Sequence, residues 1–489
     1  MSLRLGERPR GPLLLTARWV VGHENDHHVL LPGGEVVVDE GAVRFVGHGY
    51  AGEVAHRLDL GDALIGPGFV DLDALSDLDT TILGFDNQPA WRKGRVWPRS
   101  YVERGPYEMY SEDELAYQKR FAFAQLLRNG ITTALPIASL FYRQWGETVG
   151  EFEAAIDAAV ELGLRVYLGP AYRTGNVVVE SDGTMVADFD EARGLAELEA
   201  AIDFCRRHDD THGGLVRAML APDRVETCTA ELLRRSAAAA RDLAVPIRLH
   251  CCQGQMEVDT LRRLHGTTAP GWLRSLDFLS ERSLLPHATY VSGDDLDIIR
   301  DSGATIVHCP LVSARHGGVI RSFRTYREAG QRIGMGTDTW PPDMILNMQL
   351  GMMLCRVVER DIGAVRAEHY YDAATVGGAD ALGRPDLGRL RPGARADIAV
   401  IDLAHTLRGP DPIQSMMTGA SGRDVTTVLV DGRLVMHERR IAGFDDETDW
   451  PRAQAQFDGL IARYPERTHG HPPVEEIFSS SYPLRGGAR

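Results

Sequence analysis

The feature that most constrains the fold is an alternation, beginning at residue 66, of short apolar runs with longer helical stretches. This rhythm is typical of βα units, in which crossover helices join buried parallel strands. The runs that qualify as strands number eight: PGFVDLD, GITTALP, LRVYLGP, LVRAMLA, PIRLHCC, ATYVSG, TIVHCP and RIGMGTD. Because eight parallel strands close a barrel, the chain is predicted to be an α/β protein built on a (β/α)8 TIM-type barrel.

Two of the intervening segments are predicted as helices. Residues 111–129 (SEDELAYQKRFAFAQLLRN) open with Ser111 and Glu114, whose spacing is that of a capping box. Residues 229–244 (TAELLRRSAAAARDLA) form the second clear helix.

Short strands broken by turns flank the barrel on both sides, between about 16 and 65 and again after 388. We expect the two ends of the chain to build one small β-sandwich together. The predicted organisation is residues 1–65 and 388–445 as its two parts, 66–387 as the catalytic barrel, and 446–489 as a C-terminal helix and tail.

Charge and composition exclude some partners. A net charge of -16 in 489 residues argues against nucleic acid or an anionic membrane surface. No apolar run reaches the roughly 18–20 residues of a membrane span, and no secretion signal is seen. The six cysteines lack the spacing of a zinc ribbon or a disulfide scaffold. These features predict a cytoplasmic protein that acts on a small molecule.

In a barrel the chemistry lies at the carboxyl ends of the strands. In order and separation, the strand ends resemble amidohydrolases of the chlorohydrolase and deaminase branch over roughly residues 16–440. The segments that carry the resemblance are GPGFVDLDAL, GITTALP, SGATIVHCP, GMGTDTWPPD, ATVGGADALG and GRLRPGARADIAVID. The resemblance implies a barrel hydrolase that uses a divalent metal ion, and proteins of this type are often dimers.

The metal signature of the family is partly replaced. Its first strand ends in His-x-His, and here those two positions hold Asp73 and Leu75. A leucine cannot donate a lone pair, and an aspartate can replace a histidine only with a shorter, anionic reach. His250, His287 and Asp338 stand where the family has its ligands on strands five, six and eight.

The resulting hypothesis is a single divalent ion, Zn or else Fe or Mn. Its ligands would be His250, His287, Asp338 and Asp73. The resemblance also makes Asp338 the base for the attacking water, and His287 would orient that water or stabilise the oxyanion. We therefore predict hydrolysis of a C–N bond, by amide hydrolysis or deamination, in a small nitrogen-containing molecule, with heterocycles among the candidates.

The substrate-binding candidates come from neighbouring strand ends: Asp223, Arg224, Gln253, Arg173 and His308. Gln253 stands where the deaminases often carry a proton-shuttling Glu, and glutamine cannot take that proton. A His in the position of His308, before Cys309 and Pro310, is more often a structural residue at a strand end than a ligand. The aromatic and cationic segment 84–110 follows the first strand and either shapes the pocket or forms a surface loop or a subunit contact.

Weaker candidates are the acidic residues Asp71, Asp77 and Asp79, which could supply replacement ligands or cap the next segment. Cys251 and Cys252 are expected to pack in the core. Three alternatives stay open: a metal-free enzyme with His287 and Asp338 as acid and base, a lyase or decarboxylase on the same barrel, and a catalytically silent binding protein.

Overall fold

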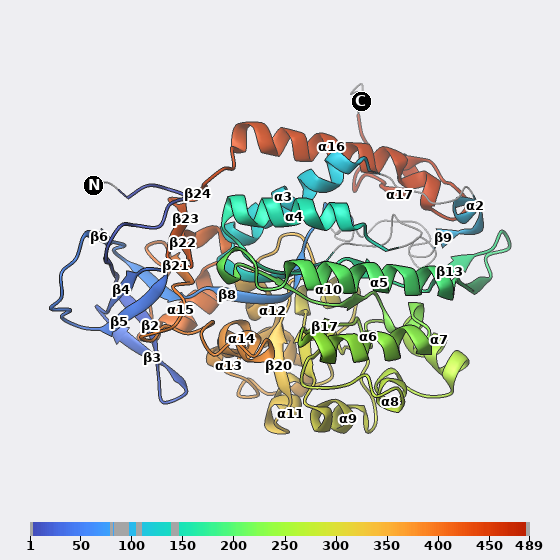
Figure 1. Ribbon diagram of the computed structural model, residues 1–489, viewed down its shortest axis with the longest axis horizontal. Helices are drawn as coiled ribbons and strands as arrows, with labels where there is room; N and C mark the ends of the chain where they lie inside the picture. The colour runs from blue at the N-terminus through green and yellow to red at the C-terminus, as the bar shows by residue number, and fades with distance from the viewer. Residues whose placement is uncertain (1–2, 79–81, 83–96, 104–109, 138–145, 486–489) are drawn as a thin grey trace.

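The computed structural model describes residues 3–78, 82, 97–103, 110–137 and 146–485 (Figure 1). Its centre is an eight-stranded parallel sheet with the strand order β15-β11-β10-β8-β20-β19-β18-β17. The strands are β8 (Phe69–Leu75), β10 (Ile131–Ile137), β11 (Arg165–Leu168), β15 (Val216–Ala218), β17 (Ile247–Arg248), β18 (Ser283–Pro286), β19 (Thr305–His308) and β20 (Arg332–Met335).

The sheet closes on itself between the fourth and fifth strands. The Leu220 N–H donates to the carbonyl of Pro246 at 3.0 Å, and the Arg248 N–H donates to the carbonyl of Leu220 at 2.9 Å. Inside the closed sheet the filling side chains include Val70, Leu72, Leu135, Met219 and Val307. The predicted barrel is therefore confirmed.

The sixth strand was predicted in the wrong place. The prediction was ATYVSG, residues 288–293, because β-branched and aromatic residues favour strands, but β18 ends at Pro286. His287 and Ala288 follow with φ values of 76° and 48°, which a strand cannot adopt. His287 consequently lies directly beyond the end of its strand.

Helices cover the outside of the barrel (Figure 1). The longer ones are α3 (Glu112–Arg128), α4 (Val149–Leu162), α5 (Glu191–His208), α6 (Ala230–Leu243), α7 (Gln255–His265) and α12 (Met344–Glu359). The shorter ones are α2 (Arg99–Val102), α8 (Ala269–Ser275), α9 (Asp295–Ser302), α10 (Pro310–Arg315), α11 (Phe323–Glu328), α13 (Ala367–Asp372), α14 (Gly378–Ala381) and α15 (Pro412–Gly419). Both predicted helices are present, and Ser111 and Glu114 form the expected capping box on α3.

Beyond three strand ends lie short additions: β9 (Trp97–Pro98), β12 (Ala171–Tyr172), β13 (Gly175–Val179), β14 (Met185–Phe189) and β16 (Ala221–Pro222). Strands β12 and β16 pair in parallel with each other, and β13 pairs with both β9 and β14. They extend the barrel at the end where the strands terminate.

The two ends of the chain share a sandwich, as predicted. One sheet has the order β5-β4-β1-β6 and the other β24-β23-β22-β21-β7-β2-β3. Their strands are β1 (Leu13–Thr16), β2 (Trp19–Glu24), β3 (His27–Pro32), β4 (Glu35–Asp39), β5 (Ala42–Gly47), β6 (His56–Asp59), β7 (Ala63–Pro67), β21 (Ile398–Asp402), β22 (Val425–Val430), β23 (Arg433–His437) and β24 (Arg440–Ile441). The antiparallel pairing of β7 with β21 joins the two chain ends in one sheet.

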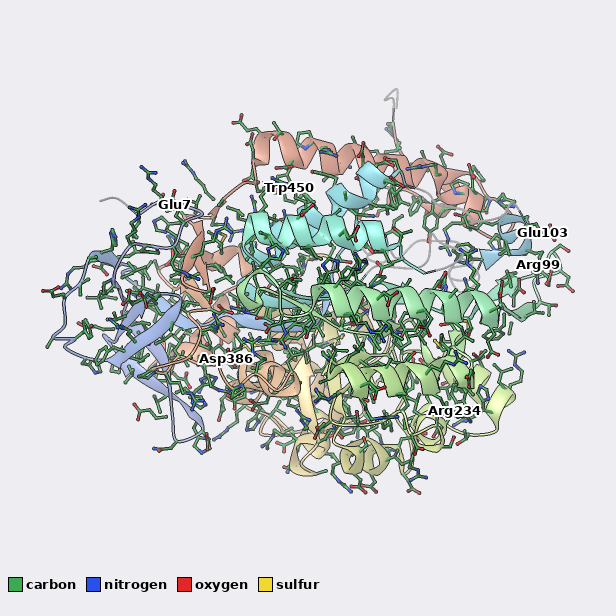
Figure 2. All side chains as sticks on the ribbon, in the orientation of Figure 1. Glu7, Arg99, Glu103, Arg234, Asp386 and Trp450 are labelled. Carbon is green, nitrogen blue, oxygen red and sulfur yellow. The ribbon has the colours of Figure 1, made fainter. Side chains whose placement is uncertain are left out.

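The C-terminal segment forms α16 (Asp446–Arg467) and α17 (Val474–Ile477), which lie across α3 at the top of Figure 1. The side chain of Gln456 donates to the carbonyl of Glu114 at 3.2 Å. Trp450, labelled in Figure 2, sets its ring edge-on to that of Phe121 with 5.0 Å between centroids. Among the described residues, no helix combines the length and apolarity needed to cross a membrane.

Candidate active site

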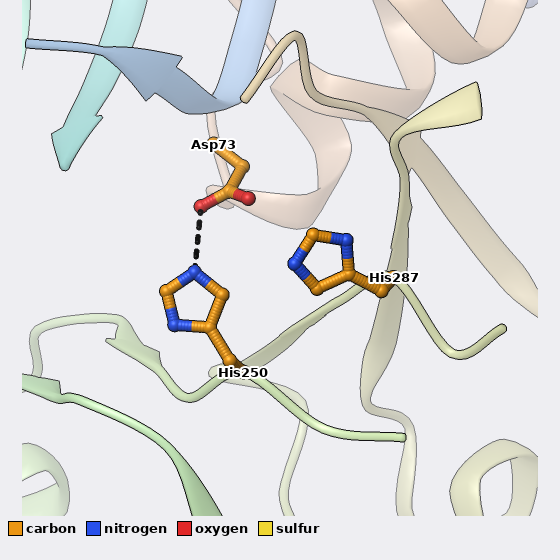
Figure 3. Close-up of side chains that lie close together, drawn as sticks. All are labelled: Asp73, His250 and His287. Carbon is orange, nitrogen blue, oxygen red and sulfur yellow. Dashed lines mark ion pairs between the residues drawn. The ribbon is translucent and has the colours of Figure 1, made fainter. Parts of the chain in front are cut away.

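Three side chains converge at the carboxyl ends of β8, β17 and β18 (Figure 3). They are Asp73, His250 and His287, and each offers a ligand atom within 4.8 Å of the others. The Nε2 atom of His250 is 3.8 Å from Oδ1 of Asp73. The two imidazole rings are stacked, with 5.4 Å between their centroids. All three are buried.

Asp338 completes this group from beyond β20. Its Oδ2 atom is 3.6 Å from Nε2 of His287, and its backbone N–H donates to the carbonyl of Asp73 at 2.8 Å. Its φ is 44°, a left-handed value that only a small share of non-glycine residues adopt. The structure thus brings together all four residues that were predicted to bind a metal ion.

Two pairs of these side chains, Asp73 with His250 and His287 with Asp338, have a spacing that fits ligands of a divalent ion. Nitrogen and oxygen ligands about 2.0–2.2 Å from a tetrahedral ion lie roughly 3.3–3.6 Å from one another. The separations of 3.6 and 3.8 Å in this group come close to that spacing. The Nδ1 atom of His250 is hydrogen-bonded to the carbonyl oxygen of Asp223 at 2.7 Å, and this bond orients Nε2 toward Asp73. Burial lowers the pKa of His250 to about 3, so the ring is neutral and able to donate a lone pair.

The group concentrates negative charge in a buried space. Burial raises the pKa of Asp73 to about 7, against the opposing effect of Arg248. The pKa of Asp338 is raised well above its usual value, first by burial and then by the neighbouring Asp73. A bound cation would offset the repulsion between these carboxylates.

Arg248 is a site residue that the sequence analysis missed. It is 3% exposed, and its Nη1 atom is 3.4 Å from Oδ1 of Asp73 and 3.5 Å from the carbonyl of Leu135. The signal was present in the sequence, because residues two apart on a strand face the same side and Arg248 precedes His250 by two. The guanidinium brings a fixed positive charge into the end of the barrel.

Asp223 and its neighbours form ion pairs beside His250. The Asp223 carboxylate lies 3.3 Å from Nη1 of the buried Arg173, and the half-buried Arg224 donates to Glu226 at 2.8 Å. Gln253 is also half-buried. These four predicted substrate-binding residues all lie close to the end of β17, and their contact with substrate stays a prediction.

His308 points away from the group. The thiol of Cys309, the residue directly after β19, lies 3.7 Å from Oδ2 of Asp73, so the side chain of the preceding His308 faces the other side of the strand. There the His308 ring packs against Phe323 and Tyr370, with centroids 5.7 and 6.0 Å away. Burial lowers its pKa to about 3. The structure favours the structural alternative for this residue.

Asp71 holds the first strand to the eighth. Its carboxylate accepts hydrogen bonds from the N–H of Thr337 at 3.0 Å, from the Thr337 hydroxyl at 2.5 Å and from the N–H of Asp73 at 3.2 Å. Asp77 is buried nearby. Asp79, the side chain of Leu75 and most of the segment 84–110 lie outside the described residues.

A second buried group follows the fifth strand, β17, in the chain. It consists of Cys251, Cys252 and Glu257. Both oxygens of Glu257 already accept hydrogen bonds, from the N–H groups of Cys252 at 2.5 Å and Gln253 at 2.7 Å. The pKa of both thiols is raised. These contacts agree with the packing role that was expected for the two cysteines.

Residues 68–435 match the model of the Amidohydrolase family. Two similar proteins are 5-methylthioadenosine/S-adenosylhomocysteine deaminases. That of Halobacterium salinarum is 26% identical over 439 residues, covering 88% of this chain and 94% of the relative. That of Natronomonas pharaonis is 28% identical over 434 residues, covering 87% and 93%.

Solved structures share the fold. An adenosine deaminase from Xanthomonas campestris with bound zinc gives a TM-score of 0.75 at 19% identity, covering 92% of this chain and 99% of that one. An atrazine chlorohydrolase from Arthrobacter aurescens, in complex with zinc and atraton, gives 0.76 at 22% identity, covering 91% and 99%. The match of the family model spans most of the barrel and part of the sandwich, and so the chain belongs to the amidohydrolase family.

Proposed function

We propose that this protein hydrolyses a C–N bond in a small nitrogen-containing molecule, by amide hydrolysis or by deamination. The observation that carries the proposal is the convergence of Asp73, His250 and His287, whose ligand atoms lie within 4.8 Å of one another. Two similar proteins are deaminases, which supports the same class of reaction.

A single divalent ion, Zn or else Fe or Mn, would be held by Asp73, His250, His287 and Asp338. Such an ion supplies Lewis acidity, which acidifies a water molecule and polarises the bond to be cleaved. The zinc in the solved relatives supports this assignment. Because Asp73 replaces one histidine of the family and Leu75 the other, the proposal is for one ion.

Asp338 is the proposed proton carrier. The water oxygen forms a bond to the electrophilic carbon while one water proton moves to Oδ2 of Asp338; the other proton stays on the new hydroxyl group. The C–N bond then breaks, and Asp338 returns its proton to the leaving nitrogen. His287, whose Nε2 lies 3.6 Å from this carboxylate, orients the water or stabilises the developing oxyanion.

Gln253 limits the proton routes of the site. Its amide can donate and accept hydrogen bonds but cannot carry a proton near neutral pH. Both proton transfers therefore fall to Asp338, which suits simple hydrolysis better than the usual deamination. Arg248 places a fixed positive charge next to Asp73. This charge stabilises the negative charge that develops during the reaction.

The test combines metal analysis with a substrate panel. Protein purified without chelator is expected to contain one Zn, Fe or Mn ion per chain and to release ammonia or an amine from some members of a panel of amides and amino-heterocycles. Removal of the ion should abolish turnover, and one equivalent should restore it. A protein with far less than one ion per chain and with no hydrolysis on the panel would contradict the proposal.

A metal-free enzyme is the second candidate, and the position of Arg248 favours it. Its guanidinium already places a cation 3.4 Å from Asp73. In that case turnover should persist after complete chelation and should be lost on substitution Arg248→Met. The metal-dependent candidate predicts the opposite result of chelation.

A further inference from the structure

Lys119 of helix α3 has its charged end in the interior of the protein. Its Nζ atom lies 3.2 Å from Oε1 of Glu147, 3.0 Å from Oε1 of Glu151 and 3.1 Å from the hydroxyl of Ser76. The side chains of the lysine and both glutamates are only 1% exposed. The ammonium also lies 5.1 Å from the centre of the Phe152 ring.

The partners of this ammonium connect the carboxyl ends of three neighbouring barrel strands. Ser76 directly follows β8, and its hydroxyl donates to the carbonyl of Ile137, the last residue of β10. Glu147 bonds twice to Ala171, just beyond β11: its Oε2 accepts from the Ala171 N–H at 2.8 Å, and its own N–H donates to the Ala171 carbonyl at 2.8 Å. The end of the barrel that is joined here is the end that carries the active site.

Helix α3 holds the segment after β8 at a second point. The side chain of Gln118, next to Lys119, accepts a hydrogen bond from the N–H of Leu78 at 3.3 Å. Residues 76–78 are therefore tied to the helix three to five positions beyond Asp73. A displacement of α3 would be transmitted to the strand end from which Asp73 reaches the other ligands.

The charges of the lysine cluster continue into the active site. Glu147 acts electrostatically on Arg248, tending to raise its pKa against the effect of burial, and Arg248 pairs with Asp73. Charges of alternating sign thus run inward in the order Glu151, Lys119, Glu147, Arg248 and Asp73. Each member compensates its neighbours, which is what permits so many ionised groups to be buried together.

We infer that Lys119 is a positioning residue for the active site: its buried ammonium fixes the ends of β8, β10 and β11 and, through Glu147 and Arg248, the place of Asp73. Apolar side chains of similar volume would fill the same space without the cost of removing three charges from water. The charged cluster provides a directed geometry that apolar packing does not. The catalytic consequence rests on the proposed function, whereas the structural consequence does not.

The test removes the three charges together. Lys119→Met alone would leave two buried carboxylates without their cation and could prevent folding. The triple variant Lys119→Met, Glu147→Gln and Glu151→Gln avoids this and keeps an oxygen at residue 147 to accept the Ala171 N–H. The matched control is Arg235→Met with Glu231→Gln, which removes an exposed ion pair from helix α6.

Hydrogen exchange measured by mass spectrometry reports the structural consequence. Peptides covering residues 70–78 and 332–340 are expected to exchange faster in the triple variant than in the wild type and the control. The zinc Kd, measured by competition with a chelator, is expected to rise by roughly tenfold or more, as is usual when support of metal ligands is removed. The value of kcat should fall by more than KM changes.

A folded triple variant with unchanged exchange and unchanged zinc Kd would overturn the inference. If the wild type binds no zinc and hydrolyses nothing, the proposed function fails. In that case the exchange comparison still decides whether Lys119 positions the strand ends, since it requires neither metal nor substrate.

Discussion

Asp338 combines a proposed chemical role with an environment that is unfavourable for a carboxylate. The residue sits in a left-handed backbone conformation and is buried among other acids, so its ionised form is unfavourable without a cation. If residue 338 had only a structural role, a neutral side chain would give a more stable protein. The retained carboxylate therefore points to a proton or metal function, and its replacement separates function from stability.

We expect Asp338→Asn to lower kcat by roughly 10²–10⁴-fold, because the amide cannot carry a proton. The same change should leave the melting temperature of the chelated protein equal or higher, since burial and the neighbouring Asp73 make the ionised carboxylate unfavourable. Steady-state kinetics and thermal melts in the presence of a chelator measure the two effects. A variant that turned over substrate at the wild-type rate would remove Asp338 from the mechanism.

Arg248 and Asp73 form the second informative pair. Substitution Arg248→Met leaves a buried carboxylate without its cation, which costs about 3–5 kcal/mol. We expect the metal-free variant to melt well below the metal-free wild type, and added zinc to raise the melting temperature of the variant by more than it raises that of the wild type. Equal zinc-induced shifts in both proteins would show that the zinc ion does not replace the guanidinium in neutralising the carboxylate of Asp73.

Strand-end reasoning could place His250 and Asp338 because each follows an apolar run that the barrel brings to the same end. His287 was placed by the resemblance to the family, since the predicted sixth strand began after it. It missed Arg248, since an arginine within a strand is ordinarily assigned to solvent, although its spacing of two from His250 indicates the same inward side. It gave His308 two readings, and the choice between them depended on which face of β19 the ring occupies. Register is set by long-range pairing, which no local pattern contains.

Among the helices and strands, those whose ends are fixed by local hydrogen bonds were predicted best from the sequence. The capping box that starts α3 was readable from Ser111 and Glu114 alone. The position of the sixth strand was not, because Leu284 and Leu285 give a shorter apolar signal than the residues that follow His287. The network around Lys119 was also hidden, since it joins four separate segments.

The start of α3 matters beyond its own stability, because the helix carries Gln118 and Lys119 to the strand ends. Substitution Ser111→Ala removes the hydroxyl that accepts the Glu114 N–H at 3.2 Å. We expect a loss of about 1 kcal/mol in the free energy of unfolding, measured as a lower denaturation midpoint. The exchange of residues 112–116 should also become faster. An unchanged midpoint would mean that packing under α16 alone sets the start of the helix.

For the whole molecule, the sandwich and the barrel meet at a junction that contains the half-buried His28. His28 of strand β3 bonds through Nε2 to the hydroxyl of Thr375 at 3.1 Å and sets its ring edge-on to Tyr371 at 5.4 Å. Both partners belong to the last part of the barrel segment, after strand β20. A proton added to His28 would place a charge between the two parts of the protein.

This junction predicts a loss of stability in acid. Burial first, and then His23, lowers the pKa of His28 from 6.5 to about 4. The unfolded chain takes up a proton near pH 6.5 and the folded one only near pH 4, so the stability is fully present above pH 6.5 and falls through that window. The expected loss is at most about 3 kcal/mol, because each pKa unit corresponds to about 1.4 kcal/mol.

Denaturation of the wild type and of His28→Gln at pH 7.5 and pH 5 should show a smaller pH effect in the variant. The control His405→Gln, at an exposed position, should behave as the wild type. Equal pH effects in all three proteins would assign the acid sensitivity to other groups.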